Sequence, residues 1–291
     1  MDNQGKNAAG FGGLLFLFAV AGLLFVSLIF SFAINAASVE TDSLIYYILN
    51  YSVSPLILLA VLVFAKKVTA EPFFHIAAVK KFDVLYLIAA LILPFSALFG
   101  FGILNDLVEN LGRELNLHVP EINLPLNGVK EYVLFIFFIC VIPAVFEEFF
   151  FRGVLTRCLS NCGVIVAAFF SGLCFALYHL SVFSFVYQFI FGIVLGVLRW
   201  KSKSVIPCVI AHFLNNLIIL SIEFFGVVIN YYAPILIVFG VTVTVGVLLF
   251  TFFYKREKIA SSTERVKDFL LPYGLIAVIT AVAVSVAGAV A

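Results

Sequence analysis

Charged residues are scarce in this 291-residue chain. Lys, Arg, Asp and Glu together make up 11% of it, whereas an average soluble domain carries about 25%. With 64% hydrophobic residues, the composition excludes an ordinary water-soluble globule and predicts a polytopic membrane protein. No basic tract and no Gly-rich phosphate loop occurs, and the formal net charge is +1, so nucleic acid is not an expected partner.

Cysteines with redox or metal-binding spacing are missing as well. No C-x-x-C motif occurs, which argues against a disulfide framework. We predict that the cysteines are small buried side chains. Cys158 and Cys162 are four residues apart, so a metal or redox pair is the weaker alternative. All five lie in or beside apolar segments: Cys140, Cys158, Cys162, Cys174 and Cys208.

Apolar runs of the length that a membrane-spanning helix needs, about 20 residues, recur along the chain. They predict an all-α, polytopic transmembrane helix bundle of about eight or nine spanning helices. The sixth run is short and is interrupted by Gly192 and Gly196, so it is the least secure. The first run is too long for a cleaved signal peptide and is expected to remain as a helix. The nine runs cover about residues 11–37, 44–65, 84–105, 132–158, 163–181, 183–199, 204–228, 231–254 and 269–290.

The loop cations predict an orientation, because cytoplasmic loops are enriched in Lys and Arg. With the N-terminus in the cytoplasm, the outer side receives only Arg113 and Lys130. We therefore predict an integral membrane protein with a cytoplasmic N-terminus and an external C-terminus, and its short loops are typical of a bacterial inner-membrane protein. The inner side receives Lys6, Lys66, Lys67, Lys80, Lys81, Arg199, Lys201, Lys203, Lys255, Arg256, Lys258, Arg265 and Lys267, with Arg152 and Arg157 nearby.

The longest outer loop is predicted between about residues 106 and 131. We expect a solvated, partly amphipathic segment, with a substrate-guiding lid as the alternative. Its acidic residues are Asp106, Glu109, Glu114, Glu121 and Glu131.

Two adjacent acids stand inside the fourth apolar run. Glu147 and Glu148 lie in VLFIFFICVIPAVFEEFFFRG, where a charged side chain costs about 2.5–3.5 kcal/mol to insert. Glu148 and Arg152 are i and i+4, which predicts an ion pair on one helix face. Glu147 is rotated by about 100° from Glu148 and has no local cation. A desolvated carboxylate of this kind suits a general base.

Two histidines and an amide fall in other apolar runs. If the turn between the fourth and fifth helices lies at Ser160–Gly163, Glu147 and His179 rise about 20 and 24 Å above it. His212 and Asn216, which are i and i+4 on one face, rise about 12–18 Å from the inner surface, and tilt can bring all four to one level. His179 precedes the turn into the sixth helix. Either that hairpin ends below the outer surface or His179 is shallower than the other groups.

These four groups on three helices favour a catalytic site over isolated structural residues. Glu147 is predicted as the base, and His179 can share the proton traffic. His212 and Asn216 can present two donors to a developing oxyanion.

At these residues the chain resembles the CAAX prenyl protease and bacteriocin-processing family, also called Abi or CPBP. Three motifs match in order: EExxxR at residues 147–152, FxxxH at 175–179 and HxxxN at 212–216. The resemblance covers about residues 130–220. It divides the chain into N-terminal helices and loops (1–131), catalytic core helices (132–220) and C-terminal helices (221–291).

The resemblance implies an intramembrane endopeptidase that hydrolyses a peptide bond with water activated by Glu147 and aided by His179. His212 and Asn216 resemble the family's oxyanion-stabilising pair. The implied partners are the lipid bilayer and a membrane-associated peptide or protein substrate, either a prenylated C-terminal peptide, a bacteriocin leader or another membrane protein. The implied supporting residues are Glu148 and Arg152, with Phe175 shaping the site.

Metal dependence stays open at this stage. The family has also been described as metal-dependent, which would make Glu147, His179 and His212 metal ligands. The chain lacks H-E-x-x-H, but two His and one Glu can build a zinc site. We favour a metal-free glutamate mechanism with no cofactor, and keep zinc as the alternative.

Two other classes of function fit the same residues. A non-catalytic bacteriocin-immunity or membrane scaffold protein would keep the bundle without turnover. A proton-coupled transporter would use the intramembrane carboxylates, although no internal repeat is evident in the sequence.

Overall fold

The computed structural model describes residues 8–120, 123–254 and 265–290. Over these residues the chain is helical throughout and contains no strand. Eight of the described helices are long and apolar enough to cross a membrane. The predicted all-α bundle is therefore confirmed.

Six of the eight long helices are continuous elements, and each follows a predicted apolar run. The other two are composite. One runs over residues 129–162 as α5 (Val129–Phe135), η2 (Ile136–Val141), α6 (Ile142–Glu148), η3 (Phe149–Leu155), α7 (Thr156–Leu159) and η4 (Ser160–Cys162), and the other as α12 (Val266–Phe269), η5 (Leu270–Gly274) and α13 (Leu275–Val290). The continuous helices are α1 (Ala8–Ala36), α2 (Leu44–Thr69), α4 (Val84–Glu114), α9 (Phe185–Ser202), α10 (Ile206–Phe225) and α11 (Pro234–Tyr254).

The fifth and sixth predicted runs differ in how they form helices. The sixth gives α9, which reaches spanning length but has the lowest mean hydropathy of the eight. The fifth gives α8 (Val164–Tyr178), which has only 15 residues. The turn before α8 lies at the predicted breaker, where Gly163 has a φ of 101° that favours glycine. A short α3 (Phe73–Ile76) lies in the connection between α2 and α4.

The outer loop begins later than predicted. α4 continues as helix through Glu114, so the segment expected to leave the helix at residue 106 does so only at residue 115. The extension is stabilised by local polar contacts, since Arg113 lies 3.2 Å from Glu109 Oε2 and 3.1 Å from Asn110 Oδ1. Such i, i+4 pairs let a helix extend beyond its apolar segment.

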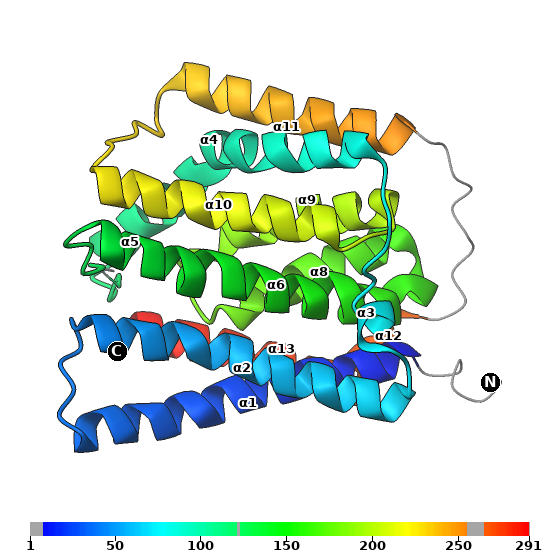
Figure 1. Ribbon diagram of the computed structural model, residues 1–291, viewed down its shortest axis with the longest axis horizontal. Coiled ribbons are helices and arrows are strands. Elements are labelled where there is room, and N and C mark those ends of the chain that lie inside the picture. Colours follow the sequence, from blue (N-terminus) through cyan, green and yellow to red (C-terminus); the bar gives the residue numbers. More distant parts are fainter. Residues whose placement is uncertain (1–7, 121–122, 255–264, 291) are drawn as a thin grey trace.

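Figure 1 shows the helices running along one common direction, with α11 and α4 on one side, α1 and α2 on the other, and α10, α9, α6 and α8 between them. Close packing in the middle depends on glycine. A Cβ atom on Gly172 of α8 would lie 2.9 Å from the backbone nitrogen of Ile193, and one on Gly192 of α9 would lie 2.8 Å from Gly172 Cα. Small residues of this kind let membrane helices approach each other closely.

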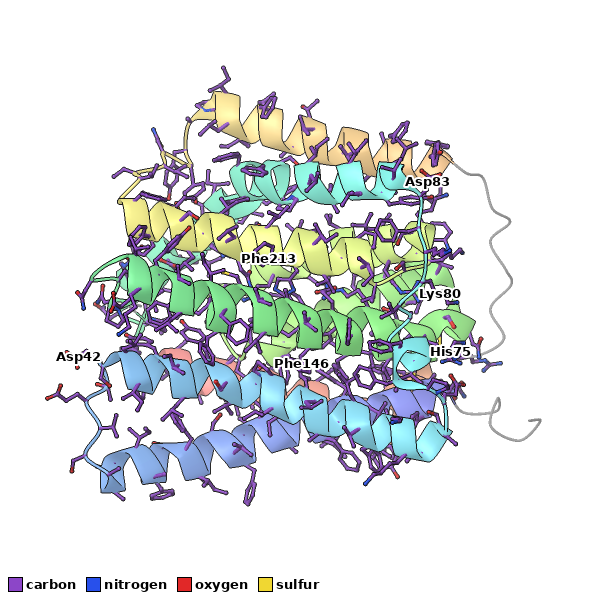
Figure 2. All side chains as sticks on the ribbon, in the orientation of Figure 1. Asp42, His75, Lys80, Asp83, Phe146 and Phe213 are labelled. Atoms are coloured by element: carbon purple, nitrogen blue, oxygen red, sulfur yellow. The ribbon has the colours of Figure 1, made fainter. Side chains whose placement is uncertain are left out.

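The described cations gather at one end of the bundle. Figure 2 shows His75 and Lys80 at that end and Asp42 at the opposite one. α1 begins at the cationic end, where Ala8 shares a cavity lining with Arg157. α13 ends at the opposite end, where the carbonyl of Ala289 accepts a 2.8 Å hydrogen bond from the backbone of His118. The cytoplasmic assignment of the cationic end stays a prediction, and Lys6, Glu121, Lys255, Arg256 and Lys258 lie outside the described residues.

The cysteines are buried, as predicted. All five belong to the described residues, and none of them forms a disulfide there. They therefore serve as small core side chains in this structure.

Candidate active site

The helix that carries the acid pair is distorted on both sides of it. Glu147 and Glu148 end α6, which lies between the π-helical turns of η2 and η3. Pro143 stands at the start of α6. Because proline has no backbone N–H, it leaves the carbonyl four residues earlier, that of Ile139, without its usual partner. Such turns are often found at functional sites.

Asn216 takes up that released carbonyl. Its Nδ2 donates a 3.1 Å hydrogen bond to the oxygen of Ile139. The bond ties α10 to η2 close to the acid pair. In η3 the carbonyl of Phe151 is used in the same way, because the hydroxyls of Thr156 and Ser171 each donate to it at 2.8 Å. The distorted helix is thus anchored through its own exposed carbonyls.

Glu148 and Arg152 form the ion pair that their spacing predicts. Nη1 of Arg152 lies 2.7 Å from Oε1 of Glu148, and both side chains are fully buried. Nη2 of Arg152 also donates to the carbonyl of Gly192 at 3.1 Å. The guanidinium lies over the ring of Phe175, 4.3 Å from its centroid. The buried cation is therefore satisfied by a carboxylate, a carbonyl and an aromatic face.

Glu148 holds His212 through the same oxygen. Nδ1 of His212 lies 2.9 Å from Oε1 of Glu148. A carboxylate beside an arginine accepts hydrogen bonds, so this contact places a ring proton on Nδ1 of His212. The other ring nitrogen, Nε2, points into the cavity towards Glu147.

His179 is oriented by the backbone. Its Nδ1 lies 2.8 Å from the carbonyl oxygen of Phe175, one turn earlier on α8. A carbonyl only accepts, so Nδ1 carries the proton and Nε2 of the neutral ring is an acceptor. α8 ends just before His179, and this short helix places the ring at the level of Glu147. The structure therefore selects the first sequence alternative, in which the hairpin after His179 ends inside the bundle.

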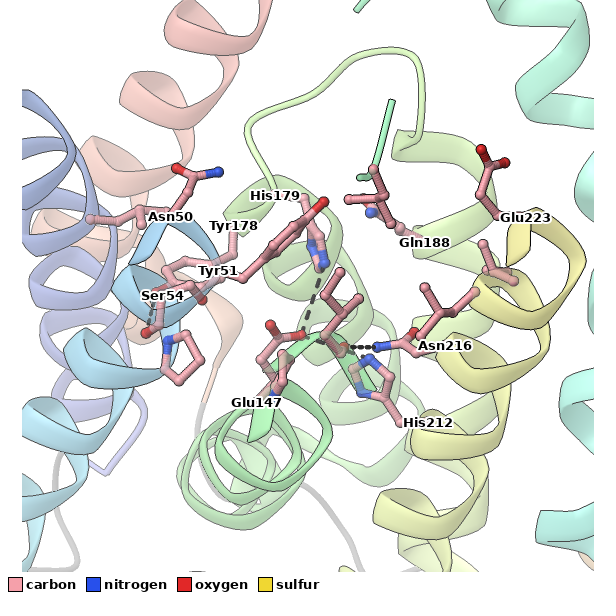
Figure 3. Close-up of a pocket in the computed structure, with 17 residues that line it drawn as sticks. Asn50, Tyr51, Ser54, Glu147, Tyr178, His179, Gln188, His212, Asn216 and Glu223 are labelled. Carbon is pink, nitrogen blue, oxygen red and sulfur yellow. Dashed lines mark hydrogen bonds and ion pairs between the residues drawn. The ribbon is translucent and has the colours of Figure 1, made fainter. Parts of the chain in front are cut away.

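Glu147 faces both histidines (Figure 3). Its Oε2 lies 3.9 Å from Nε2 of His179 and 3.9 Å from Nε2 of His212. Both distances exceed direct hydrogen-bond range. Glu147 is only 6% exposed, and its Oε2 is buried without a hydrogen-bond partner. A buried polar atom in this state is a position where a ligand or water is expected to bind.

Phe175 lies at the centre of these groups. Its ring centroid is 4.8 Å from that of His179 and 5.5 Å from that of His212, both edge to face. The ring therefore separates the two imidazoles while it covers Arg152.

The acid and the histidines open into a cavity of about 590 Å³. All four predicted catalytic residues line it, whereas Glu148, Arg152 and Phe175 lie behind its wall. The opposite wall comes from α2, where the sequence analysis found no motif. Asn50 and Ser54 are polar residues at i and i+4 in an apolar run, and that spacing was the available signal. The lining is Leu23, Asn50, Tyr51, Ser54, Pro55, Leu124, Ile139, Pro143, Glu147, Tyr178, His179, Gln188, His212, Asn216, Ile219, Leu220 and Glu223.

The residues named as zinc ligands do not fit the ion in this arrangement. Within the described part of the chain, no group of three or more His, Cys, Asp or Glu side chains is placed to hold a metal. Ligands about 2.0–2.1 Å from a tetrahedral zinc lie about 3.3 Å from one another. Here each histidine nitrogen is 3.9 Å from Glu147 Oε2. No step below is derived through a metal.

Comparison with known proteins identifies the region that contains the site. Residues 129–218 match the model of a protein family described as type II CAAX prenyl endopeptidase Rce1-like. The chain contains an Rce1-like domain. No curated protein and no solved structure matches the chain.

The Rce1-like domain runs from the start of α5 into α10 and holds all seven residues of the three motifs. The resemblance stated from the sequence is confirmed, and the family points to an intramembrane protease. The chain is an integral membrane protein with about eight spans. Its cavity is completed by α1 and α2, which lie outside the Rce1-like domain. The three-part division at residues 131 and 220 stays a prediction.

Proposed function

We propose that the chain is an intramembrane endopeptidase that hydrolyses a peptide bond of a membrane-associated peptide or protein, with water activated by Glu147. One observation carries the proposal. A buried carboxylate oxygen without a hydrogen-bond partner faces two histidine nitrogens, each 3.9 Å away, inside a cavity.

The attacking water binds between Glu147 and His179. A gap of 3.9 Å is too long for a direct bond, but a displaced water can bridge it. Both facing atoms are acceptors, since His179 carries its proton on Nδ1. The two hydrogens of the water therefore point at Glu147 and His179, and a lone pair is left for the peptide carbonyl. Glu147 takes one proton as the carbon–oxygen bond forms.

The developing oxyanion is stabilised by His212 and Asn216. Nδ1 of His212 is held by Glu148, so Nε2 donates when the ring carries both protons, and Glu148 then stabilises the imidazolium. The amide of Asn216 has two N–H donors. One is committed to Ile139, and the second is free for the oxyanion.

Collapse of the tetrahedral intermediate breaks the carbon–nitrogen bond. Glu147 returns its proton to the leaving amine and is regenerated as a carboxylate. The balance is one water consumed per peptide bond, with a new carboxyl group and a new amine as products.

The test uses the purified full-length chain in proteoliposomes. A panel of membrane-associated peptides, prenylated and unprenylated, is incubated with the protein, and the fragments are read by mass spectrometry. Glu147→Gln keeps the size and polarity of the side chain but removes the base, so kcat/KM should fall at least about 100-fold. Glu114→Gln, an exposed residue at the end of α4, is the matched control and should cleave at the wild-type rate.

Unchanged turnover in Glu147→Gln would refute the proposed chemistry. Binding of a peptide without cleavage by any form of the protein would favour the non-catalytic immunity or scaffold class. Flux that depends on a pH gradient would favour the transporter class.

A further inference from the structure

The charges around the cavity indicate which peptide segment it accepts, and this inference rests on the proposed function. Two carboxylates line the cavity, those of Glu147 and Glu223. None of the described lining residues is Lys or Arg. Arg152 lies behind the wall and is committed to Glu148 and Gly192.

Two uncharged side chains of the lining add acceptors that lack donors. Oε1 of Gln188 and Oγ of Ser54 are buried, and neither has a hydrogen-bond partner. Figure 3 shows Gln188 and Glu223 on one side of the cavity and Asn50, Tyr51 and Ser54 on the other. An acceptor-rich wall of this kind is complementary to a group that only donates, such as an ammonium or a guanidinium.

The position of Glu223 sets a register. It follows Asn216 by seven residues on α10, so it lies on the same face about two turns, or about 10 Å, away. An extended peptide rises about 3.3 Å per residue. A substrate whose reacting carbonyl is at Asn216 therefore brings a residue about three positions away to Glu223.

We propose that the cavity binds an extended peptide with a Lys or Arg side chain about three residues from the cleaved bond, held by the Glu223 carboxylate and Gln188 Oε1. A cationic side chain satisfies both acceptors. It also brings positive charge to the end of the bundle where α4 carries Asp106, Glu109 and Glu114.

The same register disfavours a substrate that ends at the mouth of the cavity in a free carboxylate. A CAAX segment is C-terminal, so its chain carboxylate lies three residues beyond the cysteine. In this cavity that carboxylate would come close to Glu223 with no lysine or arginine in the described lining to neutralise it. Repulsion between like charges is a means of rejecting the wrong partner.

The experiment compares peptides that differ at one position. A cleavable membrane-associated peptide is made with Lys, Gln or Glu three residues from its cleaved bond, on either side, and the Lys peptide is also made as C-terminal acid and amide. The wild type should prefer Lys over Glu by about three- to tenfold in kcat/KM, as expected for a partly screened charge pair. The preference should decrease as ionic strength rises.

Variants of Glu223 decide whether this residue sets the preference. Glu223→Gln should bring the Lys and Glu peptides to within about twofold of each other, and Glu223→Lys should reverse the order. Glu114→Gln should keep the wild-type ratio, because this exposed acid does not line the cavity. Equal cleavage of all peptides by the wild type, or a full Lys preference in Glu223→Gln, overturns the inference.

A binding measurement separates this inference from the proposed function. The fluorescently labelled peptides are titrated onto Glu147→Gln, and their affinities are read by anisotropy. A Lys preference that is lost in the Glu147→Gln, Glu223→Gln double variant supports the charge assignment even if no form of the protein cleaves. Absence of the preference in binding, together with cleavage that depends on Glu147, overturns the charge assignment alone.

Discussion

Oε1 of Glu148 lies 2.9 Å from Nδ1 of His212, although 64 residues separate them in the chain. The same oxygen lies 2.7 Å from Nη1 of Arg152. One buried carboxylate oxygen therefore joins the EExxxR motif on α6–η3 to the HxxxN motif on α10. It neutralises an arginine and orients a histidine of the cavity at the same time.

This double contact predicts that stability and activity can be separated. Glu148→Gln and Arg152→Met should each lower the free energy of unfolding by about 3–5 kcal/mol, because each leaves a buried partner unmatched. The double variant removes both charges and should recover most of that loss in thermal unfolding. It should not recover peptide cleavage, since His212 still lacks its carboxylate. Recovery of cleavage together with stability would contradict the role given to Glu148.

Asn216 and Pro143 should be coupled in stability. Asn216→Ala leaves the carbonyl of Ile139 without a donor and should cost about 1–3 kcal/mol. Pro143→Ala restores a backbone N–H to the helix, so the same Asn216→Ala change should cost less in that background. A double-mutant cycle of unfolding measures the difference. Strictly additive effects would show that the bond to Ile139 is not the reason for the loss.

Asn216 should also matter for the reaction apart from stability. Pro143→Ala, Asn216→Ala should unfold near the temperature of Pro143→Ala alone and yet cleave about 100-fold more slowly, as expected when one oxyanion donor is removed. Steady-state kinetics of the two purified variants provides the comparison. Equal kcat values would leave Asn216 with a structural role only.

Much of the fold could be predicted from composition and spacing. Every predicted apolar run forms a helix, and the Glu148–Arg152 pair follows from local i, i+4 geometry. The contact of Glu148 with His212 could not be predicted in this way. A helix that is apolar all round carries no moment to show which face meets which neighbour. Rotation and tilt inside the bundle are set by packing between helices, which one sequence does not reveal.

The wall formed by α2 was missed for the same reason. Asn50 and Ser54 were visible as isolated polar residues, but only the packing of α2 on α6 brings them opposite His179 and His212. The extra length of α4 was missed because apolar length alone marks a span, whereas Glu109 and Arg113 stabilise the helix beyond it.

An ion pair outside the spanning segments predicts a pH dependence of stability. Nη2 of Arg157 donates to Oε1 of Glu71 at 2.8 Å, and Nδ1 of His75 lies 2.7 Å from Oε2. Hydrogen bonding to Arg157, with a smaller effect of His75, holds the pKa of Glu71 below its ordinary value of 4.5. The stabilisation is therefore present above pH 4.5 and is lost as the pH falls through the lowered pKa.

Thermal unfolding of wild type and Glu71→Gln across this acid range provides the check. The difference in Tm between them should be largest above pH 4.5 and should shrink below it. Arg157→Gln should lose the same pH dependence, because it removes the main partner. A difference that grows on acidification would contradict the ion pair.

Removal of metal should leave the reaction intact. The spacing of Glu147, His179 and His212 is too wide for a shared tetrahedral zinc. We expect substoichiometric zinc in the purified protein by elemental analysis and unchanged cleavage after treatment with a zinc chelator, with a zinc protease as the positive control. Stoichiometric zinc, together with activity lost to the chelator and restored by zinc, would assign these residues as ligands instead.

The most direct test of the account follows the oxygen atom of the attacking water. Wild type and Glu147→Gln are incubated with a cleavable peptide in water enriched in oxygen-18, and the fragments are weighed by mass spectrometry over time. The account predicts one heavy oxygen in the new carboxyl group of the wild-type product and a rate at least about 100-fold lower in Glu147→Gln. Labelled fragments from Glu147→Gln at the wild-type rate would contradict the claim that Glu147 activates the water.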